Sequence, residues 1–308
     1  MTGPREYSDV RYLRAKRSVD QRALNRPVLE QLRAAIAGLP APVRVLELGA
    51  GVGTTVSRLA DLGTITRARY TLVDQDRASL AAAAGDLRAW GGAAGGGGDG
   101  GGDAIVVRDG RRDLEVRLVA ANVFDWLAAA DAGADGPYDL IVAHAFLDLV
   151  DVGALLPALW RRLGPARPFW FTINFDGETI FLPERLFDDA VIALYHHTMD
   201  QRVRDGRSAG DSHAGRNLLL QIPQSGARLL GAGGSDWVVW PSAERTYPED
   251  EAYFLHHIVH TIEGALAGSP SLDAPALAAW VDARHDDVDH GEMIYIAHQL
   301  DIVGLAPG

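Results

Sequence analysis

The spacing of apolar residues predicts a helix near the start of the chain. Within residues 18–39, Val28, Leu29, Leu32 and Ile36 recur every three or four positions, as they do on one face of a helix. A glycine and a proline follow at the end of this run and stop it. The segment before the first apolar strand is therefore expected to be helical.

Beyond this helix, short apolar runs alternate with longer amphipathic segments, which is typical of strands alternating with helices. The expected strands are 43–48, 70–73, 105–108, 114–120, 140–143 and 169–173, and the expected helices are 54–62, 76–90, 127–132 and 152–163. Asp109-Gly110 joins two of these strands and is a strong hairpin signal. Strand and helix alternate five times, so the sequence predicts an α/β fold with a mainly parallel sheet.

After residue 175 the alternation gives way to mostly helical segments with a few short strands. Helices are expected at 186–203, 214–221, 248–267 and 275–285, and strands at 229–231, 237–240 and 292–298. No linker of disordered composition separates the two halves, so we expect a single domain, 1–308, with insertions. Its expected parts are an N-terminal helical lid (1–40), a core (43–175), two cap insertions (176–213 and 241–291) and a last strand (292–304).

Composition narrows the functional classes. Acidic residues outnumber basic ones by 41 to 29, and the resulting net charge of −12 disfavours nucleic acid and anionic membranes as partners. The chain has no cysteine, which excludes a disulfide framework and a thiolate nucleophile or zinc site. No apolar signal core or membrane-length apolar run is present, so a cytoplasmic location is expected.

One segment has an unusual composition. Nine of the 34 glycines lie between residues 91 and 102. Such a tract cannot bury apolar surface, and it predicts a flexible surface loop.

The strongest chemical signal is a glycine-rich turn between the first strand and the next helix. It carries the pattern Glu47-x-Gly49-x-Gly51-x-Gly53. Glycines permit positive φ angles and a close approach of a ligand to the backbone, and a helix N-terminus offers free N–H groups. Asp74 ends the second strand, where an acid can accept hydrogen bonds from both hydroxyls of a ribose. These features predict a site for a nucleotide-like cofactor.

The details of the turn distinguish between two cofactor classes. A dinucleotide-binding fingerprint that starts at Gly49 would need glycine or alanine at position 54, where this chain has Thr54. The pattern instead resembles the first motif of class I S-adenosylmethionine-dependent methyltransferases, whose cofactor carries a sulfonium and an amino group. The cationic cofactor explains the acid at Glu47. A nicotinamide-dependent oxidoreductase is disfavoured, and a plain strand-to-helix turn without a ligand remains the alternative.

The resemblance implies a Rossmann-like, doubly wound, mainly parallel seven-stranded sheet with helical caps, and S-adenosylmethionine as the cofactor. It implies methyl transfer to a small-molecule acceptor, since a closed cap suits a small acceptor, and a homodimer is possible. A basic residue of the N-terminal helices, Arg17 or its neighbour Lys16, would meet the cofactor carboxylate, unless both belong to a solvated helix face. Asp76 competes with Asp74 for the ribose. The implied cofactor-binding residues are Glu47, Gly49, Gly51, Gly53, Asp74, Asn122 and Arg17.

Two histidines are candidates for a catalytic base. His144 follows the fourth strand, where the resemblance places residues that face the transferred methyl group, and Asp148 one turn later could orient it. His197 lies in the cap and ranks second. A hydrogen-bonded structural role is the alternative for His144. Without a convincing base, a protein that keeps the cofactor fold but transfers no methyl group is the alternative function.

No metal site is expected. The string His256-His257-x-x-His260 has two histidines on one helix face, as metal ligands often are, but the glutamate of the metalloprotease motif is replaced by a histidine. The acidic segment 285–290 is better explained as a solvated loop.

Overall fold

A computed structural model describes residues 4, 6–92, 104–129 and 137–308. The predicted glycine-rich loop lies largely at 93–103, outside the described residues. No helix in the described part of the chain is long and apolar enough to cross a membrane.

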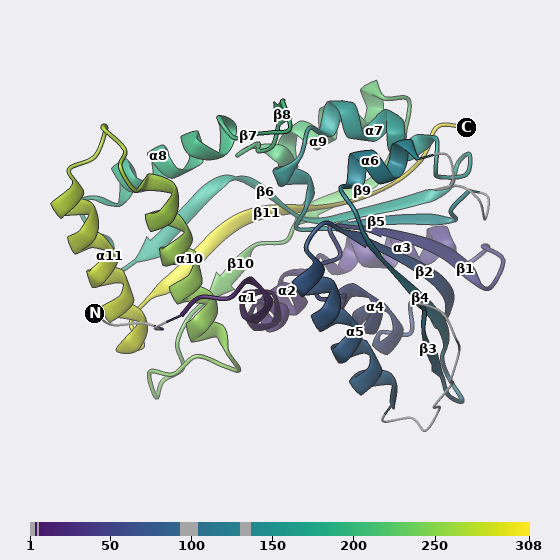
Figure 1. Cartoon of the computed structure of the whole chain (residues 1–308), viewed down its shortest axis with the longest axis horizontal. Coiled ribbons are helices and arrows are strands. Elements are labelled where there is room, and N and C mark those ends of the chain that lie inside the picture. Colours follow the sequence, from purple (N-terminus) through teal and green to yellow (C-terminus); the bar gives the residue numbers. More distant parts are fainter. Residues whose placement is uncertain (1–3, 5, 93–103, 130–136) are drawn as a thin grey trace.

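The centre of the molecule is a nine-stranded mixed sheet (Figure 1). The strand order is β10-β11-β6-β5-β1-β2-β4-β3, and β9 pairs with β11 beside β10. The five core strands β4, β2, β1, β5 and β6 are parallel, whereas β11 and the edge strand β3 are antiparallel to their neighbours. The strands are β1 (Val43–Leu48), β2 (Arg67–Asp74), β3 (Ala104–Arg108), β4 (Asp113–Ala120), β5 (Leu140–His144), β6 (Pro168–Leu182), β9 (Arg228–Gly234), β10 (Trp237–Val239) and β11 (Ile294–Leu305).

The prediction of a mainly parallel, Rossmann-like α/β sheet is confirmed. The sheet has nine strands instead of seven for two reasons. The hairpin strand β3 adds to one edge, and the strand before the last is divided into β9 and β10. Both halves of this divided strand pair with β11, and all three lie where the sequence predicted strands, at 229–231, 237–240 and 292–298.

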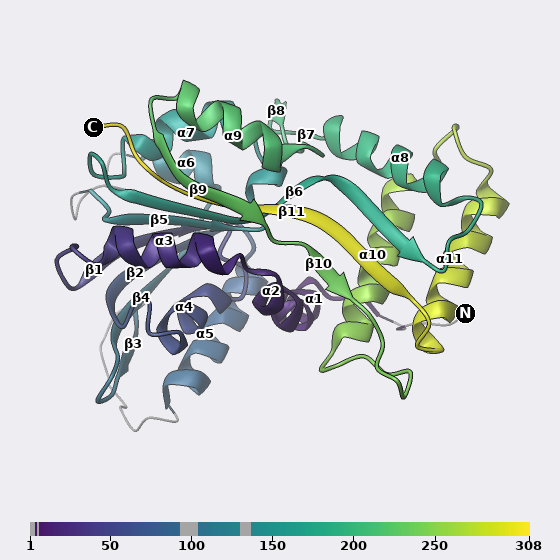
Figure 2. The same cartoon turned by 180° about the vertical axis from the view of Figure 1, so that it is seen from behind.

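Helices pack on both faces of the sheet (Figures 1 and 2). Side chains alternate between the faces along β1: Val45 joins the core beneath α3 and α4, and Leu46 joins the core beneath α6 and α7. Both faces are buried, so apolar residues of β1 point to both sides of the sheet. The helices here are α3 (Arg26–Ile36), α4 (Thr54–Asp61), α5 (Arg77–Gly92), α6 (Val123–Ala128), α7 (Val152–Trp160) and α9 (Ala214–Gln224).

The strands β6 and β11 are longer than the sequence suggests, and they carry a second lobe. They pair continuously from Pro168↔Leu305 to Leu182↔Ile294, with two register shifts. The expected boundary between core and cap at 175 therefore falls inside β6. Asp176-Gly177 resembles a turn signal, but the strand passes through it with Gly177 at φ +81°. Helices α8 (Asp188–Asp200), α10 (Glu251–Leu266) and α11 (Ala274–Asp289) pack around this extension (Figure 2).

The N-terminal segment forms three helices, not one long helix. These are α1 (Asp9–Ala15), α2 (Arg17–Ala23) and α3. The expected helix 18–39 is interrupted because the side chain of Asn25 accepts a hydrogen bond from the Val28 N–H and starts α3 anew, with a proline in its first turn. Helix α1 contacts α5 of the core and α10 of the second lobe, so it spans the space between them.

Candidate active site

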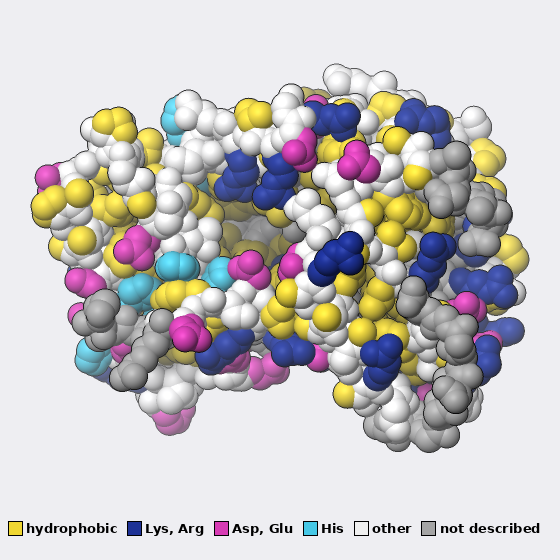
Figure 3. All heavy atoms as spheres, viewed as in Figure 1, with side chains coloured by type: hydrophobic (Ala, Val, Ile, Leu, Met, Phe, Trp, Pro, Cys, Tyr) yellow, Lys and Arg dark blue, Asp and Glu magenta, His cyan; other side chains and the backbone are white. Residues whose placement is uncertain are grey.

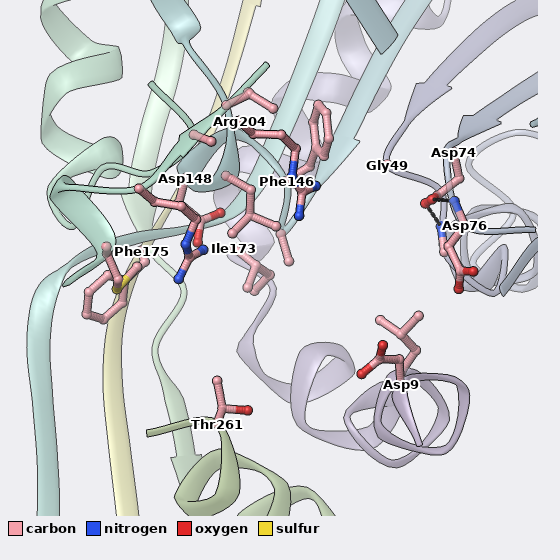
Figure 4. Close-up of a pocket in the computed structure, with 18 of the residues that line it drawn as sticks. Asp9, Gly49, Asp74, Asp76, Phe146, Asp148, Ile173, Phe175, Arg204 and Thr261 are labelled. Carbon is pink, nitrogen blue, oxygen red and sulfur yellow. Dashed lines mark hydrogen bonds between the residues drawn. The ribbon is translucent and has the colours of Figure 1, made fainter. Parts of the chain in front are cut away.

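A cavity of about 740 Å³ lies between the core, the second lobe and α1. It opens at the carboxyl ends of β1, β2, β4 and β5, which is where open α/β sheets bind ligands. Figure 3 shows the hollow on the surface, and Figure 4 shows side chains that line it. The volume is in the upper part of the range of roughly 300–1,000 Å³ for small-molecule sites, so two small reactants have room.

The glycine-rich turn forms the end of the cavity next to β1. Gly49, Gly51 and Gly53 all have positive φ angles, of 60°, 51° and 71°. A side chain at Gly49 would place its Cβ 2.3 Å from the ring of Phe146. Gly49 and Gly51 line the cavity, whereas Gly53 lies behind them and begins α4. The turn therefore presents the backbone of Gly49 and Gly51 to the cavity, and the positive φ angles are those that the sequence led us to expect.

Asp74 and Asp76 also line this end of the cavity, and both already bind backbone N–H groups (Figure 4). The carboxylate of Asp74 accepts hydrogen bonds from the N–H groups of Gly51 and Asp76, at 2.8 Å each. Asp76 accepts from the N–H groups of Ala78 and Ser79, at 3.0 Å each, and begins α5. Asp74 thus fixes the glycine-rich turn, and its remaining lone pairs face the same end of the cavity.

Asn122 lies beside them at the start of α6 and lines the cavity. Its Oδ1 accepts a hydrogen bond of 2.9 Å from the N–H of Phe124. Among the described residues, no protein group accepts a hydrogen bond from its amide NH₂. Phe124 and Asp125 extend the wall from this point.

The structure separates the other two predicted cofactor residues from the cavity wall. Glu47 is 2% exposed, and burial raises its pKa to about 7 despite a hydrogen bond with Thr55. Its Oε2 is buried without a hydrogen-bond partner in the described part of the chain. Arg17 is exposed, whereas Lys16 is 6% exposed and lines the cavity. Of these two adjacent basic residues, Lys16 and not Arg17 therefore faces the ligand space.

His144 occupies a buried polar cluster and does not line the cavity. Its Nε2 lies 2.9 Å from Asp20 Oδ2, and its Nδ1 lies 2.7 Å from Thr172 Oγ1. Burial lowers the pKa of His144 to about 4, although the Asp20 carboxylate opposes the shift. The neutral ring with Nε2–H donating to Asp20 and Nδ1 accepting from Thr172 satisfies these two contacts, while Arg58 Nη1 lies 3.3 Å from the same Nε2. Both ring nitrogens are used, which favours the structural alternative for His144.

His197 and its neighbour differ in position. His197 is exposed on α8, with its Nε2 2.8 Å from Gln201 Nε2, and it does not line the cavity. His196 lies 3.0 Å from Thr179, which does line the cavity. Neither of the two predicted bases therefore reaches the ligand space.

Asp148, which the sequence predicted to orient His144, has a different position in the structure. It lines the cavity, but it does not orient His144, which is paired with Asp20 instead. Its Oδ1 is buried, and no group among the described residues hydrogen-bonds to it. Burial raises the pKa of Asp148 to about 6. The signal in the sequence is an acid flanked by apolar residues directly after a strand, in Phe-Leu-Asp-Leu-Val.

The rest of the wall is largely apolar or aromatic and comes from many elements. Tyr12 of α1 stacks on His257 of α10, with ring centroids 4.2 Å apart. The members of this wall are Tyr12, Leu13, Phe146, Ile173, Phe175, Tyr195, Met199, Trp237 and Tyr295. Such a surface suits an organic ligand with few polar groups.

The histidine string on α10 does not converge on one point. His256 pairs with His285 at 2.9 Å and Asp289 at 3.1 Å, while His260 stacks on Tyr7. Within the described ranges, one trio has the spacing of a metal site: Asp200, Asp211 and His213. The side chains of this trio already hydrogen-bond with Ser212, Asn217 and the nearby backbone.

Comparisons with known proteins give only distant likenesses. No protein-family model matches the chain, and no curated protein matches it in sequence. A methyltransferase from Thiobacillus denitrificans, solved with S-adenosylhomocysteine, is 16% identical with a TM-score of 0.44, and the match covers 98% of this chain and 99% of that one. Geranyl diphosphate C-methyltransferase from Streptomyces coelicolor is 12% identical with a TM-score of 0.43, covering 90% and 74%.

Phosphoethanolamine N-methyltransferase 2 from Haemonchus contortus is 11% identical with a TM-score of 0.44, covering 99% of this chain and 59% of that one. All three solved structures are S-adenosylmethionine-dependent methyltransferases by description. Similarities with such low identities and TM-scores concern the backbone fold alone. The fold is therefore assigned from the strand order described above, and the activity is inferred from the site.

Proposed function

We propose that this protein is an S-adenosylmethionine-dependent methyltransferase that acts on a small-molecule acceptor. The observation that supports this most is the arrangement at one end of the cavity. There, the bare backbone of Gly49 and Gly51, the Asp74 carboxylate and the unpaired amide of Asn122 face one space. Apart from Glu47, which is buried and does not line the cavity, these are groups that the resemblance assigns to the S-adenosylmethionine site.

The residues present fit such a cofactor. Gly49 and Gly51 line the cavity at positive φ angles without side chains of their own, so their backbone is part of the wall that a ligand would meet. Asp74 would accept hydrogen bonds from the ribose, and Asn122 would donate its amide to the adenine. Of the two basic residues predicted to meet the cofactor carboxylate, Arg17 and Lys16, the buried Lys16 lines the cavity and would bind that carboxylate. When bound, the cofactor supplies an electrophilic methyl group.

The chain's own contribution to the rate would be alignment and exclusion of water. The apolar wall around Ile173, Phe175 and Met199 would hold the acceptor body against the methyl group. The lid residues Tyr12 and Leu13 close the cavity from the α1 side. The attacking atom would be an oxygen, nitrogen or carbon of the acceptor.

Asp148 takes the place of His144 as the candidate proton acceptor. It reaches the cavity and has an unpaired oxygen, and a carboxylate with a pKa of about 6 is ionised at neutral pH yet more basic than usual. The proton would pass from the acceptor to Asp148 as the methyl group is transferred. A protein that binds the cofactor without methyl transfer remains the alternative function, because neither of the two histidines predicted as bases lines the cavity.

Calorimetric titration with S-adenosylhomocysteine and, separately, with NAD tests the cofactor. We expect S-adenosylhomocysteine to bind and NAD not to bind. Asn122→Ala and Asp74→Asn should each lower S-adenosylhomocysteine affinity about tenfold or more, because hydrogen bonds to charged or buried groups contribute about 1.5–3 kcal/mol. Asp273→Asn, at the start of α11 and away from the cavity, is the matched control and should not change affinity. Binding of NAD instead would refute the proposal.

Asp148→Asn tests the proton acceptor, with any acceptor found by screening for release of S-adenosylhomocysteine. The wild-type kcat/KM should fall as pH drops below about 6, as the carboxylate is protonated. The variant should lose about 10²–10⁴ in turnover and the acid limb of its profile, with cofactor affinity unchanged. A variant with full turnover would leave positioning as the mechanism and remove Asp148 from it.

A further inference from the structure

Three arginines gather at one rim of the cavity, on the segment that connects α8 to α9. Arg202, Arg204 and Arg207 lie on or beside the hairpin of β7 (Val203–Arg204) and β8 (Arg207–Ser208), and all three line the cavity. Figure 3 shows basic side chains along this rim of the hollow, and Figure 4 shows Arg204 on the same side of the cavity as Asp148 and Phe146.

These arginines differ from many others in the molecule because no carboxylate neutralises them. Among the described residues, none of the three guanidinium groups forms an ion pair or hydrogen bond. The guanidinium carbon of Arg207 lies over the Phe124 ring, 4.5 Å from its centre. By contrast, Arg11 pairs with Asp250 at 2.8 Å and Arg14 pairs with Asp86 at 2.7 Å.

Three of the four basic residues that line the cavity are grouped at this rim, whereas the six aspartates of the lining are spread around it. Asp205 lies on the same hairpin and Asp148 lies on the same side of the cavity as Arg204, and both line the cavity. Neither is within ion-pair distance of an arginine in the described part of the chain. Arg202 is close enough to Asp148 for its charge to oppose the rise in the pKa of that carboxyl. In a chain of net charge −12, an unpaired basic group at a cavity mouth is an electrostatic attractor for anions.

Arginine side chains have the geometry to bind oxyanions. The planar guanidinium donates paired N–H groups that match the oxygens of a phosphate or carboxylate. The wall beyond the rim is apolar, with Ile173, Phe175 and Met199. The ligand space therefore combines an anion-binding mouth with an apolar interior.

We propose that the acceptor is an organic oxyanion, a phosphate or a carboxylate, whose charged group binds Arg202, Arg204 and Arg207 while its apolar body enters the cavity. The proposal rests on the proposed function, because it names the substrate class of the same site. It places the charged end of the acceptor at the hairpin and the reacting end toward the glycine-rich turn. Binding of the anion would also reduce the influence of Arg202 on Asp148, which would make that carboxylate a stronger base.

The test uses three probes of similar size: phenyl phosphate, benzoate and benzyl alcohol. Each is titrated calorimetrically into the protein saturated with S-adenosylhomocysteine. We expect at least one anion to bind about tenfold or more tightly than the neutral alcohol, and to weaken as salt is added. Tighter binding of phenyl phosphate identifies a phosphate acceptor, and tighter binding of benzoate identifies a carboxylate. Equal binding of all three probes would overturn the proposal.

The double variant Arg202→Gln/Arg204→Gln assigns the anion to the rim. It should lower anion affinity about tenfold or more and leave S-adenosylhomocysteine affinity within twofold. Arg69→Gln is the matched control, because Arg69 is an exposed arginine of β2 away from the cavity. Unchanged anion affinity in the double variant overturns the proposal. A parallel loss of S-adenosylhomocysteine affinity also overturns it, because the arginines would then hold the cofactor.

The outcome remains separable from that of the proposed function. If the wild-type protein fails to bind S-adenosylhomocysteine, the proposed function fails, and the three probes are titrated into the protein alone. Anion binding that the double variant abolishes would then still establish an oxyanion site at this rim.

Discussion

Replacing Asp20 by asparagine should destabilise the protein more than any change to a surface ion pair. Asp20 lies in α2 and is 2% exposed. Its Oδ1 accepts a hydrogen bond of 2.9 Å from Trp237 Nε1, and its Oδ2 lies 2.9 Å from His144 Nε2. Lys16 Nζ and Arg58 Nη2 are 3.4 Å and 3.9 Å from the same Oδ2. One carboxylate thus serves four partners, three of which come from distant parts of the chain.

The expected loss follows from the charges that would remain. Burial alone would raise the pKa of Asp20, but Lys16, His144 and Arg58 outweigh it and hold the pKa below its usual range. Asp20→Asn keeps the shape but leaves two buried cations without an anion. Removing one partner of a buried pair costs about 3–5 kcal/mol. This is a large part of a typical unfolding free energy of about 5–15 kcal/mol.

Urea unfolding monitored by circular dichroism measures the effect. Asp86→Asn is the control, because Asp86 also pairs with a basic residue of the N-terminal helices, Arg14, at 2.7 Å. The Asp86 side chain is 42% exposed, so its loss should cost about 1 kcal/mol or less. The reasoning would be refuted if Asp20→Asn lowered the unfolding free energy no more than Asp86→Asn.

Three other changes have defined outcomes. Gly49→Ala should lower the melting temperature more than Gly63→Ala: both glycines have positive φ, but only at Gly49 would the new Cβ meet another side chain, that of Phe146. The pKa of His144 is about 4 in the folded state and about 6.5 in the unfolded state, so the unfolded state binds more protons between these pH values. The contribution of His144 to stability is therefore lost as pH falls from about 6.5 to 4. His144→Gln should flatten that part of a stability–pH curve measured by urea unfolding. Glu47 has the opposite sign, with a folded pKa of about 7 above its unfolded value, so its own contribution to stability is lost as pH rises from about 4.5 to 7 and opposes that of His144; Glu47→Gln should therefore make the rise of stability with pH steeper in the same measurement.

Elements that depend on neighbouring residues could be predicted from the sequence. Elements that depend on pairing with strands far away in the sequence were predicted less well. The strand 43–48 matches β1 residue for residue, and the hairpin at Asp109-Gly110 joins β3 and β4. These features depend on short apolar runs and turn residues. The length of β6 was missed because its second half is stabilised by pairing with β11, more than a hundred residues later. Pairing of that kind leaves no local pattern, and Asp176-Gly177 resembled a chain reversal.

The same distinction separates the two ends of the cavity. The cofactor end is built from backbone geometry: positive φ at Gly49 and Gly51, and the Asp74 carboxylate bound to the Gly51 N–H. Such geometry requires particular residues at fixed spacing, so the sequence displays it. The acceptor end is built from side chains of separate elements, and which of them reach the cavity depends on tertiary packing. His144 follows the right strand, yet Asp20, 124 positions earlier, pairs with it and leaves Asp148 as the carboxylate in the ligand space. A motif therefore predicts the cofactor that we propose for this protein, whereas the acceptor class that we propose rests on charges that only the folded chain brings together.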